Sequence, residues 1–538
     1  MGQPDASLPA SWRLPRRWLV SLFALALVVR LAHVLALTQS PYFANPVVDA
    51  AEYDTIGWSL AHRRGHPDRV FWHPPGYPCF LGSVWWLFGD SYLAPRLIQA
   101  LLGALSVVLV AWIGSRPFGP HVGLAGGLGA ALYGMLVYFD GELLTPTLTI
   151  FLLLASVACA FHAMETQRWS WWTATGMCGG LAGIVTATTL IIPLALAWAA
   201  RRKAIIVLLA TALVVAPVTL RNFVRGHQFV LVSSNGGVNF WIGNNPDYQA
   251  MVDIRPNLEW QRLVDEPRRA GVYGEAAESR FFVRKALAWA KSHPWAFLRL
   301  QAHKLRLLLS GNEIYRNQAI YPARQYSPIL AVLLWKVPGV AFPFGLLMPL
   351  GVLGLWVGTR RAPLLAVIVL ALAFMVQLFF VTARYRILFV PFLLIFAAEG
   401  GRWLVHTAHR RQKIIAGLAV LALFLLANLG QGPMDRRMNP DAEYSLAVRL
   451  GERGHMKEAQ ALFESVVAAH PGYAEAWLNL AVCYDEAGRP SDAEAALRRA
   501  LHLDRDAVKL LQSFMRQGKP EVVRKLLEHV RAITAGQR

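Results

Sequence analysis

Long apolar segments recur along most of the chain and alternate with short polar segments. A helix of about 20 apolar residues crosses the hydrocarbon core of a bilayer, so this series predicts an all-α, polytopic membrane bundle. About eleven crossings are predicted, at residues 18–37, 97–113, 122–138, 143–163, 171–185, 190–200, 205–220, 340–357, 364–381, 387–398 and 414–429. The aromatic segment 77–88 is better interpreted as an interfacial or re-entrant piece.

Basic residues lie beside every second apolar segment. They occur at residues 13–17, 116, 168, 201–203, 360–361 and 402–413. Because Lys and Arg concentrate in cytoplasmic loops, the first segment is predicted to leave the cytoplasm, and its long apolar run without an A-x-A site predicts that it is not cleaved. An odd number of crossings then places the loop at residue 49, the segment 221–326 and the C-terminus outside. In a bacterium this is the periplasmic side of the inner membrane.

The segment 221–326 is too long for a structureless connection. Helical periodicity at 274–292 and 294–309 predicts a folded cap over the membrane domain, which we place at 1–430.

From residue 441 onward the chain becomes charged, rich in alanine and amphipathic. Three positions recur with an offset of 34 residues (488 − 454 = 34): Gly454 and Gly488, Ala459 and Ala493, Phe463 and Leu497. This is the tetratricopeptide period, so two repeats and a shortened third at 506–533 are predicted within a module at 441–533. The pattern leaves open whether the module stabilises the protein or docks a partner. A module that stacks on itself predicts a membrane domain that works without it.

Composition supports the membrane class. Hydrophobic residues make up 55% of the 538 residues, 16% are charged, and the mean hydropathy is +0.38. The net charge of +20 lies in clusters beside apolar segments, so topology explains it and no nucleic-acid partner is predicted. The four scattered cysteines predict neither a disulfide framework nor a zinc site.

Two acidic pairs lie on the predicted outer side, each next to an apolar segment. Asp49 and Glu52 follow the first segment, and Asp140 and Glu142 lie in the second outer loop. A carboxylate at the mouth of a helical bundle can take a proton from a hydroxyl. Ordinary solvated charge is the alternative for each residue alone, but two pairs on one side favour a chemical role.

Three arginines also need an explanation. Arg384 and Arg386 lie in an outer loop, where topology gives no reason for positive charge, and guanidinium groups suit phosphate. The alternative is pairing with acidic groups of the outer loops. Arg30 lies within the first apolar segment, where it needs a carboxylate or a ligand unless it reaches the interface.

Further polar candidates lie in two outer segments. His73 begins a rigid, proline-rich turn at 73–78. Asn239 and Asn244 lie in the glycine- and amide-rich segment 233–246, which suits hydrogen bonding to a polyhydroxylated molecule. A tight irregular turn would explain the same composition.

Several motifs, in their order along the chain, resemble the bacterial GT-C glycosyltransferases of the family 39 type. This family includes protein O-mannosyltransferases and the aminoarabinose transferase of lipid A. The matching motifs are Asp-x-x-Glu-Tyr at 49–53, Pro-Gly-Tyr-Pro at 75–78, and the segments 94–104, 139–144, 236–246 and 383–386. The likeness covers roughly residues 18–398. The sequence departs from the family at 186–189, where Thr-Ala-Thr-Thr replaces an Arg-Pro step of many relatives.

The resemblance implies a polyprenyl-phosphate sugar donor and a periplasmic glycan, lipid or protein as acceptor, with inversion at the sugar. We interpret Asp49 as the general base, oriented by Glu52 or Glu142, either of which is also a candidate for holding Mg or Mn; metal dependence stays open. Arg384 and Arg386 would neutralise the phosphate. The other candidate site residues are Asp140, Tyr53, His73, Arg30, Asn239 and Asn244.

Two other functions are open to such a chain. One is a non-catalytic scaffold in the lipid bilayer that recruits protein partners through its repeats. The other is a transporter of lipid-linked sugars, which would require charges along several spans and a half-to-half repeat. Apart from Arg30, the sequence shows neither of these two features.

Overall fold

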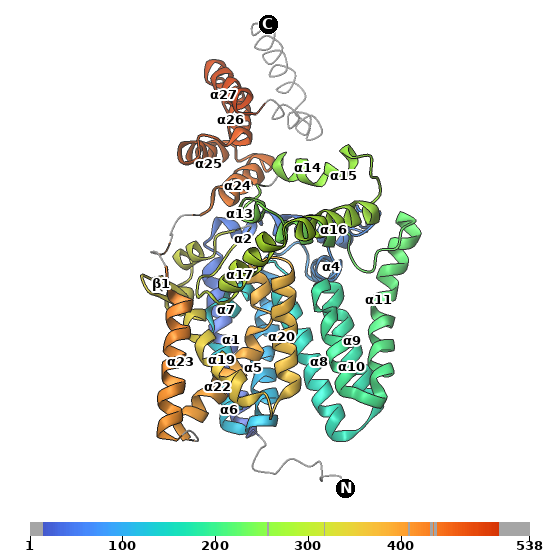
Figure 1. Cartoon of the computed structure of the whole chain (residues 1–538). Coiled ribbons are helices and arrows are strands. Elements are labelled where there is room, and N and C mark those ends of the chain that lie inside the picture. The colour runs from blue at the N-terminus through green and yellow to red at the C-terminus, as the bar shows by residue number, and fades with distance from the viewer. Residues whose placement is uncertain are drawn as a thin grey trace.

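The computed structural model describes residues 14–255, 258–316, 318–406, 409–430, 434 and 438–504. These residues are nearly all helical, with one antiparallel hairpin of β1 (Trp335–Val337) and β2 (Val340–Phe342). Figure 1 shows a bundle of long helices, a layer of shorter helices across one end of it, and helical hairpins above that layer. The predicted all-α membrane bundle is confirmed.

The bundle is built from long apolar helices and several shorter ones. Its helices are α1 (Arg16–Leu37), α5 (Leu93–Phe118), α6 (Pro120–Ala131), α7 (Gly134–Gly141), α8 (Pro146–Thr166), α9 (Trp169–Val185), α10 (Ile191–Ala200), α11 (Ala204–Gly226), α19 (Phe344–Gly358), α20 (Pro363–Leu378), α22 (Val390–His406) and α23 (Arg410–Asn428). By length and composition, five helical segments in the described residues are suited to cross a membrane, or up to six if the bent pair α6 and α7 is one span. The eleven crossings stay a prediction.

Small residues allow these helices to approach one another closely. A Cβ on Gly354 of α19 would lie 1.7 Å from the carbonyl oxygen of Phe396 in α22. Such contacts are typical of helix packing in membranes, where close van der Waals fit replaces the hydrophobic effect.

Loops with the predicted cytoplasmic basic residues meet at one end of the bundle. Arg116 pairs with Glu165 at 2.8 Å, and the Lys203 ammonium donates to the carbonyl oxygen of Gln167. Helix α1 begins at this end, and the repeat hairpins lie at the opposite end (Figure 1).

This arrangement gives a topology prediction. We expect a reporter fused after Arg538 to be active outside the cytoplasm, because the basic loops lie at the other end of the bundle. Alkaline phosphatase, active only outside, and a fluorescent protein, active only inside, measure the location in parallel. The same reporters inserted after Arg202 are the cytoplasmic control. Cytoplasmic activity at the C-terminal site would overturn the orientation.

The layer above the bundle contains the helices predicted in the outer segment. The expected helices at 274–292 and 294–309 are confirmed as α16 (Glu275–Ser292) and α17 (Pro294–Leu309). The layer also contains α2 (Pro41–Ala44), α3 (Asp49–Ala61), α4 (Gly76–Phe88), α12 (Gly236–Gly243), α13 (Tyr248–Val252), α14 (Leu258–Val264) and α15 (Glu266–Arg269). Shorter connecting helices are η2 (Ala187–Leu190), η3 (Arg201–Lys203), η4 (Tyr321–Gln325), α18 (Pro328–Leu333) and α21 (Ala383–Arg386). The aromatic segment at 77–88 forms α4, which packs against α3 near the outer end of the bundle.

The C-terminal helices form two hairpins, α24 (Pro440–Glu452) with α25 (Met456–Ala469) and α26 (Ala474–Glu486) with α27 (Pro490–Leu503). Gly454 and Gly488 lie in the turns with φ of +85° and +71°, a conformation that favours glycine and explains their recurrence. The recurring apolar positions are buried in the module. The predicted third repeat at 506–533 lies outside the described residues.

Candidate active site

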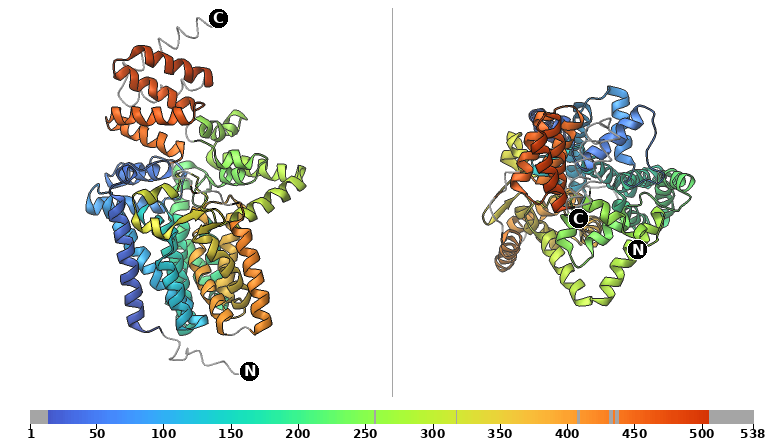
Figure 2. Two further views of the ribbon diagram at one scale, coloured as in Figure 1. Left: turned by 90° about the vertical axis from the view of Figure 1, so that its left-hand side faces the viewer. Right: turned by 90° about the horizontal axis from the view of Figure 1, so that it is seen from above.

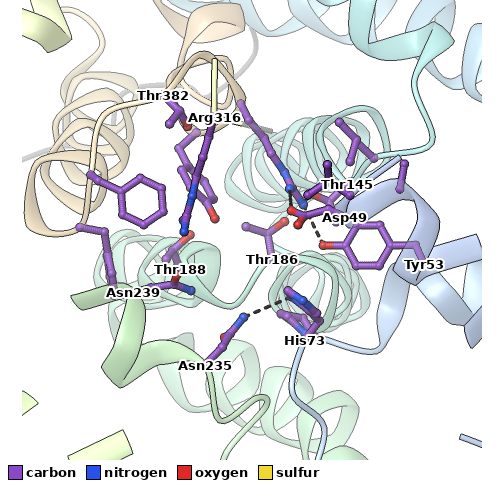
Figure 3. A pocket seen from close by; sticks show the side chains of 18 of the residues that line it. Asp49, Tyr53, His73, Thr145, Thr186, Thr188, Asn235, Asn239, Arg316 and Thr382 are labelled. Atoms are coloured by element: carbon purple, nitrogen blue, oxygen red, sulfur yellow. Dashed lines mark hydrogen bonds and ion pairs between the residues drawn. The ribbon is translucent and has the colours of Figure 1, made fainter. Parts of the chain in front are cut away.

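A cavity of about 560 Å³ lies where the bundle meets the layer above it. One wall is apolar and includes Leu372, Met375 and Val376 of α20. Polar side chains, among them Asp49, Asn235 and Arg316, surround the space in Figure 3. The cavity therefore suits a ligand with a polar head and an apolar tail.

Asp49 is the first residue of α3 and faces the cavity. The preceding Val48 has φ +51°, which is strained for a β-branched residue and is the kind of strain found at functional sites. Asp49 forms an ion pair with Arg384, whose other nitrogen donates to the Tyr53 hydroxyl at 2.8 Å and to Thr145 at 3.3 Å. Residues 335 positions apart in sequence thus form one cluster.

Electrostatics keep this pair charged. Burial alone would raise the pKa of Asp49, but the positive charges of Arg384, His73 and Arg316 outweigh it and lower that pKa. Burial lowers the pKa of Arg384, whereas Tyr53 and Asp49 raise it by more, so its pKa lies above its ordinary value. The cavity contains an ionised carboxylate whose basicity is held down by its partner.

Glu52 and His73 form a second pair beside the first. Nε2 of His73 lies 3.0 Å from the Glu52 carboxylate, and the Asn235 amide nitrogen lies 3.2 Å from Nδ1. Burial lowers the pKa of His73, but the hydrogen bond and charge of Glu52 outweigh it, so the pKa lies above its ordinary 6.5. Glu52 thus orients His73 and favours its charged form.

This pair gives a prediction for stability against pH. Since the folded-state pKa of His73 is raised, the charged form of His73 stabilises the fold. This stabilisation is complete below the unfolded-state pKa of about 6.5 and is lost as pH rises through the folded-state pKa. We expect Glu52→Gln to lower the Tm most in mild acid and least in base. Thermal unfolding between about pH 5.5 and 9 measures this.

The matched control is Asp492→Asn, which breaks an exposed pair with Arg489, a partner that does not titrate in this range. Its Tm difference from wild type should be flat with pH. A flat difference for Glu52→Gln as well would contradict the role of His73.

Arg316 is a cavity residue that the sequence analysis missed. It extends into the cavity toward Thr188 (Figure 3) and stacks on Phe380 at 4.6 Å. No ion pair or hydrogen bond of its guanidinium occurs among the residues that the structure describes. Burial lowers its pKa. The sequence did contain a signal for Arg316, because it lies in the predicted outer segment 221–326. As for Arg384, topology gives no reason for a positive charge there, and a guanidinium group suits phosphate.

Threonines line the cavity where the sequence departs from the family pattern. Thr186 and Thr188 face its interior in Figure 3, and Thr186 bonds Thr149 at 2.8 Å. The departure therefore lies at the cavity wall rather than elsewhere in the bundle.

Arg30 and Asp140 lie outside the cavity, which corrects their assignment to the site. Arg30 pairs with Asp140 at 2.6 Å in the bundle interior and points to the carbonyl oxygens of Ala130 and Ala131. Thr147 donates to the second Asp140 oxygen at 2.7 Å. The pair holds the end of α6 at its bend into α7, so both residues stabilise the fold.

Glu142 is also separated from Asp49. Its side chain borders a small space of about 20 Å³ with Tyr42 and Arg96, and Gln99 donates to its carbonyl oxygen at 2.8 Å. We therefore withdraw the interpretation that Glu142 orients Asp49.

Arg386 points away from the cavity and stabilises the fold. Its side chain is 2% exposed, pairs with Glu313 at 2.6 Å, and donates to the carbonyl oxygens of Ser310 at 2.5 Å and Asn312 at 2.8 Å. It clamps the loop at 310–316 against α21. The clamp places Arg384 and Arg316 in the cavity, but Arg386 itself does not reach a ligand there.

The two asparagines have different positions. Asn239 lines the cavity (Figure 3). Asn244 is buried, donates to the carbonyl oxygens of Phe240 at 2.9 Å and Leu378 at 2.8 Å, and faces the Lys304 ammonium at 3.3 Å. Asn244 therefore ties α12 to α20 and does not contact a cavity ligand.

The described residues contain no group of three or more His, Cys, Asp or Glu side chains arranged for a metal ion. The two cavity carboxylates near α3 are each in contact with a cation or a histidine. Dependence on Mg or Mn stays a prediction.

The helical membrane bundle and the cavity at one end of it define a class of membrane protein with a site for amphiphilic ligands. Residues 72–220 match the profile of the dolichyl-phosphate-mannose-protein mannosyltransferase family, and residues 452–531 match a tetratricopeptide repeat. The chain therefore carries a domain of this mannosyltransferase family and a repeat segment, which confirms the resemblance. No curated protein matches the chain.

Solved structures give weaker likenesses. One is the oligosaccharyltransferase AglB of Archaeoglobus fulgidus in complex with an inhibitory peptide and a dolichol-phosphate, which is 15% identical with a TM-score of 0.44. The match covers 82% of this chain and 59% of the AglB chain. Another is ArnT of Cupriavidus metallidurans bound to undecaprenyl phosphate, which is 14% identical with a TM-score of 0.35. This match covers 81% of this chain and 88% of the ArnT chain. The chain thus spans about 59% of the archaeal enzyme. We base no functional conclusion on likenesses of this strength.

Proposed function

We propose that this protein is an integral membrane glycosyltransferase that transfers a sugar from a polyprenyl-phosphate donor to an acceptor hydroxyl on the periplasmic side. The observation that carries this proposal is the half-buried Asp49–Arg384 pair in a cavity that also has an apolar lining. The family match over residues 72–220 supports the reaction class.

In the proposed reaction, the acceptor oxygen attacks the anomeric carbon from the side opposite the phosphate. The bond from carbon to the phosphate oxygen breaks, the bond to the acceptor oxygen forms, and the acceptor proton passes to the Asp49 carboxylate. The electron pair of the broken bond leaves with the phosphate oxygen, so the polyprenyl phosphate gains one negative charge as Asp49 is neutralised. One displacement inverts the anomeric centre, so no covalent glycosyl-enzyme is needed.

Cations and donors for the phosphate face the cavity. Nε of Arg384 and the hydroxyl of Thr382 are buried without a hydrogen-bond partner among the described residues, and Arg316 has no ion pair there. These groups can take phosphate oxygens, and two guanidiniums would offset the charge that develops on the leaving group.

Donor binding also activates the base. Arg384 holds down the pKa of Asp49. A phosphate that shares Arg384 adds negative charge beside Asp49 and reduces the attraction that Asp49 receives. The carboxylate then becomes more basic when the donor is in place.

The test uses purified full-length protein in detergent with a polyprenyl-phosphate-linked hexose. Release of polyprenyl phosphate supports the proposal, and the configuration of the released sugar or product tests inversion. Absence of release with several sugars, from protein that binds polyprenyl phosphate and is well folded, would favour the non-catalytic scaffold instead.

A further inference from the structure

The first helix of the repeat module contacts the helix that carries Asp49. Arg449 of α24 pairs with Asp54 of α3, and the Tyr92 hydroxyl lies 3.3 Å from the same Asp54 oxygen. Arg453 donates to Asn45 at 2.8 Å and to Tyr92 at 3.2 Å. In the left view of Figure 2, α24 lies directly above the blue helices of the outer layer.

The same helix reaches the cavity itself. Asp441, in the first turn of α24, is one of the residues that line the cavity, and the Tyr473 hydroxyl donates to it at 3.0 Å. The side-chain Oδ1 of Asn439 accepts a hydrogen bond at 2.8 Å from the backbone amide of Ala319, which lies between the cavity residues Gln318 and Ile320. The module therefore supplies part of the cavity wall and fixes a loop of it.

A second connection joins the module to another helix that borders the cavity. Leu258 of α14 packs in the apolar core of the module, and Arg262, one turn later, pairs with Asp504 at 2.6 Å. Trp260, on another face of this short helix, lines the cavity. Two elements that contact the module, α14 and the loop at 318–320, therefore border the cavity.

We propose that the repeat module is a constituent of the active site, in which Arg449 positions α3, and with it Asp49, through the ion pair with Asp54. This inference rests on the proposed function and goes beyond it, since it assigns to the repeats a part in the reaction itself. It replaces the expectation of a module that the membrane domain does not need.

The physical reason lies in the burial of Asp54. Its side chain is 11% exposed, and burial raises its pKa even though Arg449 opposes this. Removing one partner of such a pair leaves a charge that is poorly solvated, so α3 must shift or Asp54 must take up a proton. Asp49 lies five residues before Asp54 on the same helix, and a base displaced by about 1 Å can lose as much as a hundredfold in rate.

Arg449→Ala and Arg449→Lys test the proposal in full-length protein, with release of polyprenyl phosphate from the lipid-linked hexose as the assay. We expect the kcat of Arg449→Ala to fall about tenfold or more, with little change in the KM for donor, because the base moves and the phosphate groups do not. Arg449→Lys should retain much of the activity. Asp54→Arg combined with Arg449→Asp should recover part of the loss.

The matched control is Arg489→Ala, which breaks an exposed pair with Asp492 inside the module. Its kcat should equal that of wild type. Wild-type kcat in Arg449→Ala, or a loss that the reversed pair does not recover at all, would overturn the proposal.

Hydrogen exchange separates this inference from the proposed function, because it needs no activity. Amides of residues 49–54 should exchange faster in Arg449→Ala than in wild type, and at the wild-type rate in Arg489→Ala. Wild-type exchange at residues 49–54 in Arg449→Ala would contradict the proposal that Arg449 positions α3. Faster exchange in a protein that releases no polyprenyl phosphate would instead retain the positioning of α3 and reject the transferase reaction.

Discussion

The Asp49→Asn variant is expected to insert normally and to lose at least about a hundredfold in turnover of the lipid-linked donor. Asparagine keeps the shape of the side chain and removes its affinity for a proton. The loss should appear in kcat. Affinity for polyprenyl phosphate should be at least that of wild type, because Arg384 no longer shares its charge with Asp49.

Two measurements decide this prediction. Release of polyprenyl phosphate gives the rate, and titration with polyprenyl phosphate alone gives the affinity. Asp90→Asn is the matched control, since this exposed carboxylate lies on the same side and, among the described residues, forms an ion pair with His62 alone, at 3.8 Å. Wild-type turnover in Asp49→Asn would show that Asp49 is not the general base. Loss of both the rate and the affinity for polyprenyl phosphate would show that Asp49 stabilises the structure of the site instead.

Much of the fold could be predicted from the sequence, because its signals are local. The offset of 34 residues between Gly454 and Gly488 identified the repeats, and their positive φ values show the backbone reason. Helical periodicity gave α16 and α17 almost to the residue.

The site was predicted only in part, because hydrophobic patterning indicates the side of the membrane and not which side chains meet. Asp49 and Arg384 were both candidates, yet their pairing across 335 positions depends on how α21 packs against α3. The second acidic pair lay on the same side, but the bend between α6 and α7 turns Asp140 inward to Arg30. The position of Asp140 in a predicted loop at the membrane surface does not reveal such a bend.

Neighbouring arginines also show that the sequence does not indicate which side chains reach the cavity. Arg384 and Arg386 are two residues apart on one helical turn, so their side chains point in different directions. One enters the cavity and the other clamps Glu313. Arg316 was missed because no motif marks it, although its charge on the outer side was visible in the sequence.

The second large effect is expected at Arg384. Guanidinium binds two phosphate oxygens at once and stays charged in a poorly hydrated site, whereas an ammonium supplies a point charge. Arg384→Ala should therefore lose about 2 to 5 kcal/mol of affinity for polyprenyl phosphate, and Arg384→Lys should retain part of it. Arg268→Ala, which removes an exposed outer-layer arginine paired with Glu278 at 2.9 Å, should bind as wild type does.

Loss of stability must be separated from loss of binding, because Arg384→Ala also leaves the half-buried Asp49 without its ion-pair partner. The double variant Asp49→Asn with Arg384→Ala removes that unpaired charge. We expect its Tm to recover toward wild type, while its affinity for polyprenyl phosphate stays as low as in Arg384→Ala. If affinity recovers together with Tm, Arg384 serves only to hold Asp49 and α3 in place, and the phosphate of the donor must bind elsewhere in the cavity.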